Sequence, residues 1–312
     1  MSDPQPPAAA TRPAGPTLLA VPNVSEGRDP AAIAAIAAAF DATLLDTHSD
    51  PDHNRTVFTL AGKPGRLAHA MLGGAAEALA RIDLRSHEGV HPRVGVLDVA
   101  PIVHRTDETL GAACAEALVL ADLLAEELQL PVFLYGRLTG NARARAELRR
   151  GGPAELQRRI DAGELAPDFG PSRLHPTAGA VLVAARPPLV AFNVELAPPA
   201  TLGDARRIAG LIREGGEEGL PGVRAIGVWL EHRETAQLST NIEDHDATKL
   251  SDIVDAVGRH ATPARAELVG LAPEAAFSRF PAHIPLANKR SLESALAGAG
   301  TAADLHESRP TS

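Results

Sequence analysis

The sequence predicts an α/β (α+β) fold with two subdomains. The chain has 312 residues, about twice the length of a typical domain. Apolar strand-like segments alternate with Ala- and Leu-rich helical segments. This series restarts after Arg186-Pro187-Pro188, where the Pro-Pro pair favours a stiff linker. The expected units are a disordered tail at 1–16, an N-terminal subdomain at 17–186, a C-terminal subdomain at 187–290 and a flexible tail at 291–312.

Residues 18–136 of the first half predict the order β-α-β-β-α-β-α-β. Asp29 is a suitable N-cap, and Pro30 suits the first turn of a helix that extends to Phe40. The segment 137–160 carries many charges and is typical of a solvent-exposed helix. Strands are expected at 18–26, 42–50, 55–62, 96–103, 131–136 and 179–185, and the other helices at 63–82 and 107–128.

The second half predicts a ferredoxin-like β-α-β-β-α-β unit. Thr201 and Asp204 fit a capping box at the start of a helix that ends near Arg213. Three residues separate two strand-like segments at 223–231 and 235–243, which predicts a hairpin. The other strands are expected at 189–196 and 266–272, and the other helices at 249–260 and 274–280.

Charge and composition disfavour several classes of protein. Lys and Arg total 30 and Asp and Glu total 39, a net charge of −9, so binding to phosphate backbones is unfavourable. Cys114 is the single cysteine, which excludes an intrachain disulfide and a CxxC site. No apolar stretch reaches the ~18–20 residues of a membrane span, and the first residues lack the pattern of a signal peptide. We therefore expect a soluble cytoplasmic protein that binds neither nucleic acid nor membranes.

Histidines gather in one part of the chain. Five of the twelve lie between residues 48 and 91. His48 and His53 lie where the predicted strand 42–50 runs into a polar loop, and His87 and His91 lie in the predicted loop 83–95. Loops at strand ends carry the functional sites of many α/β proteins, so both segments are candidate functional loops.

One interpretation of this pattern is a metal site. Carboxylate and imidazole side chains are ligands for Zn²⁺ or Mn²⁺, although their spacing here matches no established metal motif. The possible ligands are Asp46, His48, Asp50, Asp52, His53, His87 and His91.

The other interpretation is general acid–base catalysis on an anionic substrate. A neutral imidazole is the usual base near pH 7, and Asp46, Glu88 or Asp98 can orient it. Arg55 and Arg93 can bind carboxylates through two parallel hydrogen bonds. A loop rich in Gly and Pro at 170–179 would let the backbone approach a flat ligand closely.

Seven sequence blocks follow one another in the order typical of glutamate formimidoyltransferases. The chain therefore resembles this family over about residues 20–275, and it resembles the monofunctional bacterial form because it is too short to include the cyclodeaminase found in animals. The blocks lie at 21–27, where the residues are Val-Pro-Asn-Val-Ser-Glu-Gly, and at 45–57, 87–98, 131–136, 166–171, 191–193 and 238–241.

The resemblance implies a reaction and an architecture. Members transfer a formimino group from N-formimino-L-glutamate to N5 of tetrahydrofolate during histidine degradation, and they use no metal. Each subdomain is expected to be a sheet with helices on its outer face, with the folate co-substrate between the two. The resemblance also implies a homodimer.

The resemblance further implies roles for particular residues. The catalytic histidine of the His-Pro-Arg motif is His91, which would move protons at both reacting nitrogens. Independently of the resemblance, the charge of Arg55 and Arg93 predicts that they bind the carboxylates of the substrates. Asp46 and Asn54 are two further residues expected to bind substrate. The residues expected to contact folate are Gly170, Pro171, Ser172, Pro176 and Gly179.

The chain departs from the animal enzymes at three relevant places, and two other functions stay open. His48 stands where the animal enzymes have Asp, Ala178 stands where they have Trp, and the segment Asp50-Pro51-Asp52-His53 also differs. A metal-dependent hydrolase of formimino- or formylglutamate would use the cluster from Asp46 to His53. A non-catalytic folate-binding module would bind folate without turnover. The residues alone also leave formimino and formyl groups open as the transferred unit.

Overall fold

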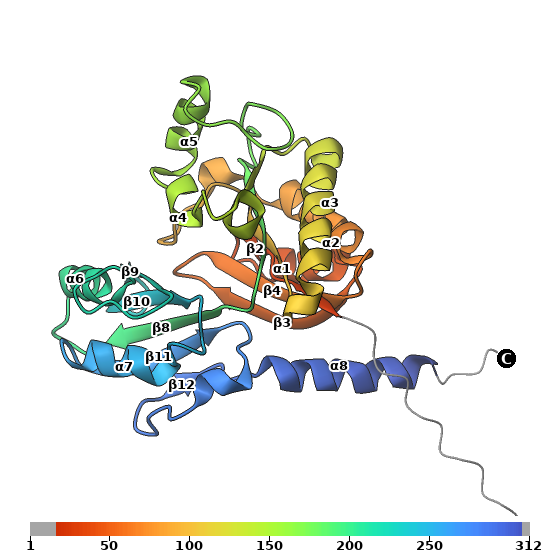
Figure 1. Ribbon diagram of the computed structural model, residues 1–312. Coiled ribbons are helices and arrows are strands. Elements are labelled where there is room, and N and C mark those ends of the chain that lie inside the picture. Colours follow the sequence, from red (N-terminus) through yellow and green to blue (C-terminus); the bar gives the residue numbers. More distant parts are fainter. Residues whose placement is uncertain (1–16, 308–312) are drawn as a thin grey trace, which may run out of the picture.

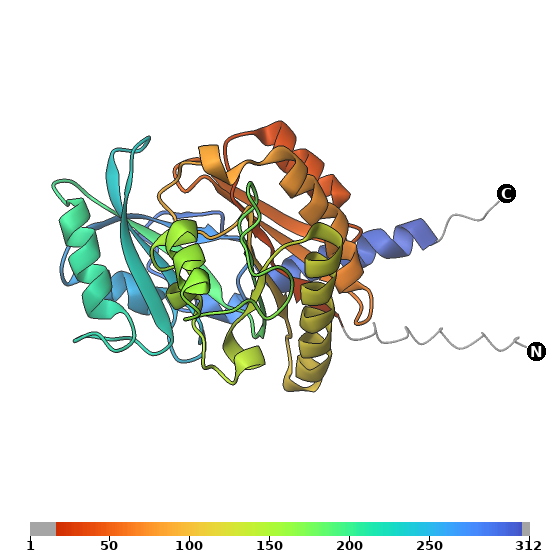
Figure 2. The same ribbon diagram turned by 90° about the horizontal axis from the view of Figure 1, so that it is seen from above.

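The structure is a computed structural model that describes residues 17–307 (Figure 1). The tail expected at 1–16 lies outside the described residues, as do residues 308–312. Within the described part, no helix has both the length and the apolar character needed to cross a bilayer. The chain forms two β-sheets, and the helices up to residue 128 and those between residues 202 and 258 lie on the sides of their sheets that face away from each other, as Figure 2 shows.

The first sheet is mixed and has seven strands. Strands β5, β7 and β6 pair in parallel, whereas the other pairs are antiparallel. The single strand expected at 18–26 is split in two around Pro22, which has no N–H group for a ladder. The strands are β1 (Leu18–Ala20), β2 (Asn23–Val24), β3 (Thr43–Asp50), β4 (Arg55–Gly62), β5 (Leu97–Val103), β6 (Val132–Leu134) and β7 (Val181–Arg186).

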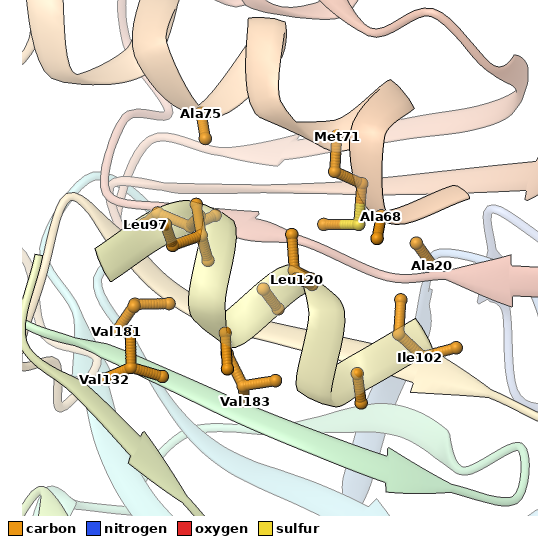
Figure 3. Close-up of a cluster of buried hydrophobic side chains, with 14 of the residues drawn as sticks. Ala20, Ala68, Met71, Ala75, Leu97, Ile102, Leu120, Val132, Val181 and Val183 are labelled. Carbon is orange, nitrogen blue, oxygen red and sulfur yellow. The ribbon is translucent and has the colours of Figure 1, made fainter. Parts of the chain in front are cut away.

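Three helices cover the outer face of this sheet, namely α1 (Pro30–Ala39), α2 (Leu67–Arg81) and α3 (Leu110–Leu128). The Asp29 carboxylate accepts hydrogen bonds from the N–H groups of Ala31 and Ala32, which confirms the predicted cap. Figure 3 shows Met71 of α2 and Leu120 of α3 over the sheet residues Leu97 and Ile102. Aliphatic side chains thus build most of this core, as the scarcity of aromatic residues required.

The segment 137–160 differs from the exposed helix that its charges predicted. It forms three short pieces, and positive φ angles of 74° and 71° at Gly151 and Gly152 separate the last two. Arg159 is buried and the Arg149 side chain is only 9% exposed, because both fill polar positions inside the fold. The pieces are η3 (Gly136–Thr139), α4 (Arg145–Leu148) and α5 (Gly152–Asp161), and the other short turns are η1 (Leu84–Ser86), η2 (Asp107–Thr109) and η4 (Glu274–Phe277).

The second sheet confirms the ferredoxin-like prediction. Its order is β12-β11-β8-β10-β9, so the four predicted strands take the spatial order 4-1-3-2. The predicted capping box is present, since the Asp204 N–H donates to the Thr201 hydroxyl and the Thr201 N–H donates to the Asp204 carboxylate. The elements are β8 (Val190–Leu196), α6 (Leu202–Ile212), β9 (Val223–Leu230), β10 (Thr235–Ile242), α7 (Leu250–Gly258), β11 (Pro263–Val269) and the added edge strand β12 (Leu286–Ala287).

The segment expected as a flexible tail at 291–312 contains a helix instead, α8 (Leu292–Glu307). Its first turns pack on the inner face of the first sheet, against residues that include Leu19 and Leu45. The packed side chains recur at the i, i+3, i+4, i+7 spacing of one helix face, and this burial explains why the segment is helical. They are Leu292, Ala295, Leu296 and Ala299.

Candidate active site

A cavity lies between the two sheets and has a volume of about 1050 Å³, its open mouth included. Strand alternation supplies its walls, because successive side chains point to opposite faces. On β8, for example, Ala191 and Asn193 line the cavity while Phe192 and Val194 belong to the core beneath α6 and α7. The inner faces of both sheets therefore meet at one space.

His91 lines this cavity and leaves one ring nitrogen free. Its Nδ1 lies 2.8 Å from the Pro92 carbonyl oxygen. A carbonyl only accepts hydrogen bonds, so Nδ1 carries the proton and Nε2 holds the lone pair in the neutral ring. Burial, and then the positive charges of Arg55 and Arg149, lower the pKa of His91 well below its ordinary value, although part of the ring is accessible. The ring is therefore neutral near pH 7, the state that a general base requires.

A buried ion pair network lies close to this ring. Asp98 on β5 is fully buried and accepts from Arg55 Nη1 at 2.7 Å and from the guanidinium of Arg149. The Val94 N–H also donates to Asp98, at 2.9 Å. Burial opposes ionisation of Asp98, yet the charges of Arg149 and Arg55 outweigh it and hold the pKa of this carboxyl below its ordinary value. Burial likewise lowers the pKa of Arg149, to about 10.

His53 and His48 bring two further imidazoles to the cavity. The His53 ring centroid lies 5.8 Å from that of His91, and its Nε2 is 2.9 Å from Gln237 Oε1 on β10 of the other sheet. His48 projects from β3, with Nδ1 at 3.5 Å from Asn288 Nδ2 and a buried Nε2 that has no partner among the described residues. Burial lowers the pKa of His48, although nearby carboxylates oppose this effect.

Ion pairs join the two subdomains around the cavity. Arg233, between β9 and β10, contacts Asp50 of the first subdomain at 3.0 Å and Glu195 of the second at 2.6 Å. His232 Nδ1 lies 2.7 Å from the Asp52 carboxylate. Burial raises the pKa of Asp52, but the hydrogen bonds from His232 outweigh it, so this pKa lies below its ordinary value. These contacts fix the acidic residues of the 46–53 segment as bridges between subdomains.

Of the four residues expected to bind substrate, Arg55 is the one that lines the cavity within the described chain. Asp46 is paired with Arg290. The Asn54 side chain accepts from the Gly27 N–H at 2.9 Å and donates to the Glu88 carbonyl at 2.8 Å, so it holds two loops together.

Arg93 points into its own loop and donates to the carbonyls of Gly89 and His87. Its guanidinium therefore organises the backbone that carries His91. Residue types do not reveal the partners of Asp46, Asn54 and Arg93, because these lie far away in the sequence or are backbone groups. The assignment of these three residues to substrate binding stays a prediction.

The segment expected to contact folate, 170–179, runs beside the backbone that carries His91. Gly179 forms a bridge with Gly95, and a Cβ at Gly179 would lie 2.2 Å from the Val94 carbonyl oxygen. Gly170 has a positive φ of 79° and a similar close approach to the Leu130 carbonyl. The chain's own backbone therefore requires these two glycines. The cavity lining includes none of Gly170, Pro171, Ser172, Pro176 and Gly179.

The candidate metal ligands do not converge on one point. Asp46 and Asp50 pair with Arg290 and Arg233, and Asp52 contacts His232. His87 Nε2 lies 2.9 Å from the Asn54 carbonyl oxygen. Within residues 17–307, no group of three or more His, Cys, Asp or Glu side chains is arranged to hold a metal ion.

Several polar residues of the cavity escaped the sequence analysis. Asn193, Ser239 and Asn241 lie within blocks that carried the family resemblance, so their strand alternation could have assigned them to the polar face. Arg145 and Arg186 also line the cavity. Arg145 lies in the segment predicted to be solvent-exposed and Arg186 at the predicted boundary, and nothing in their local sequence indicates a shared site.

The two facing sheets and the histidine-lined cavity between them define a two-lobed α/β protein, and comparison with known proteins identifies its family. The family model described as "Formiminotransferase domain, N-terminal subdomain" matches residues 17–186, and the one described as "Formiminotransferase domain" matches residues 191–284. The chain therefore belongs to the formiminotransferase family.

Its relatives include both short and long proteins. It is 38% identical over 269 residues to the pig formimidoyltransferase-cyclodeaminase. The aligned region covers 81% of this chain but 49% of the pig protein. The chain thus spans about half the length of such relatives. It is 35% identical over 264 residues to glutamate formimidoyltransferase of Streptococcus pyogenes serotype M1, covering 81% of this chain and 88% of that one. Identity to the Thermoplasma acidophilum protein of the same name is 32% over 269 residues, covering 82% and 88%.

Proposed function

We propose that this chain is a glutamate formimidoyltransferase. It transfers the formimino group from N-formimino-L-glutamate to N5 of tetrahydrofolate and yields 5-formiminotetrahydrofolate and L-glutamate, a step of histidine degradation. The observation that carries the proposal is the neutral His91 ring, whose Nε2 is free in a cavity between the two lobes of a formiminotransferase fold.

His91 acts at both nitrogens that exchange the one-carbon unit. N5 of tetrahydrofolate attacks the amidine carbon and forms a new C–N bond, while Nε2 accepts the proton that N5 loses. The tetrahedral carbon then expels the glutamate nitrogen, and the imidazolium returns its proton to that nitrogen. A positioned acid–base group of this kind contributes roughly 10²–10⁴-fold to the rate, and binding both substrates in one cavity lowers the entropic barrier.

The walls of the cavity suit the proposed co-substrate. Leu19, Val57, Val99 and Val103 give its first-sheet side an apolar surface on which the flat ring of tetrahydrofolate can pack. Arg55 is proposed to contact substrate directly, whereas Asn54 and Arg93 act by holding the loops beside the cavity and Asp46 by its pair with Arg290. Residues 170–179 are proposed to support folate binding through the backbone beside His91.

The proposal is tested by replacing the catalytic ring. His91→Ala is expected to lose roughly 10²–10⁴-fold in kcat, because the positioned acid–base group is removed, while its Kd for tetrahydrofolate stays close to that of the wild type. The ultraviolet spectrum of the folate product measures turnover. His69→Ala, at an exposed position on α2, is the matched control and is expected to be fully active.

Two outcomes would contradict the proposal. Wild-type turnover in His91→Ala would remove His91 from the reaction. Release of glutamate from formiminoglutamate at the same rate without folate would identify a hydrolase instead of a transferase.

The family resemblance also leads us to propose a homodimer that acts in the cytoplasm. Sedimentation of the purified chain tests the first of these, since a dimer has a mass of about twice 32.4 kDa.

A further inference from the structure

Two arginines line the cavity without any carboxylate partner. Arg186 is the last residue of β7 and Arg145 is the first residue of α4, and both are half-buried. Neither takes part in an ion pair with any residue of the described chain 17–307. They thus differ from Arg55, the third arginine of the lining, which is paired with Asp98.

The hydrogen bonds of Arg186 are also incomplete. Its Nη1 donates to the Pro187 carbonyl at 3.0 Å, whereas its buried Nε has no partner among the described residues. The Tyr135 hydroxyl is buried near this guanidinium and interacts with it, but it makes no hydrogen bond of ordinary geometry. Glu243 is the acidic residue that acts on Arg186 from a distance, but it is ion-paired with Arg224 at 3.4 Å.

Burial of an unpaired cation is unfavourable unless a ligand supplies the opposite charge. Burial lowers the pKa of Arg186 to about 10. The positive charge of Arg145 lowers this pKa further, whereas Tyr135 raises it. At pH 7 the Arg186 side chain nevertheless remains charged. Two neighbouring guanidinium groups with free donors therefore face a cavity that is open to substrate.

We propose that Arg145 and Arg186 form the subsite that binds a carboxylate of the substrates. The proposal rests on the proposed function, in which both N-formimino-L-glutamate and the glutamate tail of tetrahydrofolate carry such a group. A guanidinium binds a carboxylate through two parallel N–H···O bonds, and the free Nε of Arg186 is one such donor. Arg145 and Arg186 are therefore positioning residues that hold the one-carbon donor or acceptor in line with His91.

The test compares ligands that differ only in the carboxylates. Arg186→Met and Arg145→Met are each measured for KM toward N-formimino-L-glutamate and for Kd toward tetrahydrofolate and tetrahydropteroate, which lacks the glutamate tail. Loss of a charge-assisted pair is expected to weaken one carboxylate ligand about 10- to 100-fold. Arg186→Lys keeps the charge and is expected to recover part of the affinity, and Arg150→Met, at an exposed position, is the control.

The pattern of loss identifies which substrate the subsite holds. A raised KM for formiminoglutamate with unchanged folate binding assigns it to the donor. Weaker binding of tetrahydrofolate with unchanged binding of tetrahydropteroate assigns it to the folate tail. Equal losses for tetrahydrofolate and tetrahydropteroate, or no loss for any ligand in both variants, would overturn the subsite.

The subsite and the proposed function can fail separately. If the wild-type chain produces no formiminotetrahydrofolate but Arg186→Met still selectively weakens a carboxylate ligand, the subsite stands and the reaction is wrong. If the wild type turns over normally and both Met variants do too, at unchanged KM, the reaction stands and the subsite is wrong.

Discussion

Two arginines near the cavity, Arg149 and Arg186, have the same lowered pKa of about 10 but different surroundings. Arg149 is paired with the buried Asp98, which Arg55 also contacts. Arg186 has no carboxylate partner in the described chain. The difference indicates that Arg149, which has an internal partner, stabilises the fold, whereas Arg186, which has none, keeps its donors for a ligand.

The largest expected effect comes from removing the shared carboxylate. Asp98→Asn leaves Arg55 and Arg149 buried without a counter-charge, and we expect a loss of about 3–5 kcal/mol in the free energy of unfolding at pH 7. Urea unfolding measures this loss. Glu155→Gln, which removes an exposed partner of Arg158, is the control and should leave the midpoint unchanged.

The same variant makes a prediction about pH. Because the pKa of Asp98 is lowered in the folded state, its contribution to stability is fully present above its ordinary value and is lost as the pH falls through the lowered one. The gap in stability between wild type and Asp98→Asn should therefore narrow in acid. A gap of constant size from neutral pH to acid would show that the ionised carboxylate is not the stabilising group.

A smaller loss is expected for Arg149→Met, about 2 kcal/mol, because Arg55 still pairs with Asp98. This variant should also change catalysis. The pKa of His91 is lowered in part by the Arg149 charge, so the wild-type acid limb of kcat/KM should lie below pH 6.5 and should move to higher pH in the variant. If the acid limb of kcat/KM stays at the same pH in the variant, the charge of Arg149 does not lower the pKa of His91.

The smallest effect on stability is expected for Arg186→Met. Without ligand, its free energy of unfolding should match the wild type within roughly 0.5 kcal/mol, because no internal ion pair is lost. The rise in Tm that the carboxylate ligand causes should shrink instead. A large loss of stability without ligand would place Arg186 in the same class as Arg149.

Local patterns predicted much of the fold because they record which face of each element is buried. The β-α-β-β-α-β order and the cap at Thr201 follow from alternation and from residues three positions apart. The conformation and the burial of the charged segment 137–160 could not be predicted in this way. Arg149 is buried because Asp98 lies beside it in space, although the two are 51 residues apart in sequence.

The site was predictable to a similar degree. The motif placed His91 on a loop at the cavity, and the abundance of nearby histidines pointed to the same region. The roles of Asn54 and Arg93 were not predictable, since their side chains bond to backbone atoms of neighbouring loops. An amide or guanidinium that supports a loop has the same sequence signature as one that binds a ligand.

Helix α8 has a mechanical consequence for the two lobes. The chain passes between them at residues 187–189 and returns after β12, where Arg290 contacts Asp46 and Leu292 packs against Leu19. The lobes are therefore connected twice, by the linker at 187–189 and by the segment from Arg290 to Leu292. Rotation of one lobe about the Pro-Pro linker alone would pull Leu292 out of its apolar contacts. Substrate entry by small adjustments at the open mouth is therefore less costly than wide separation of the lobes.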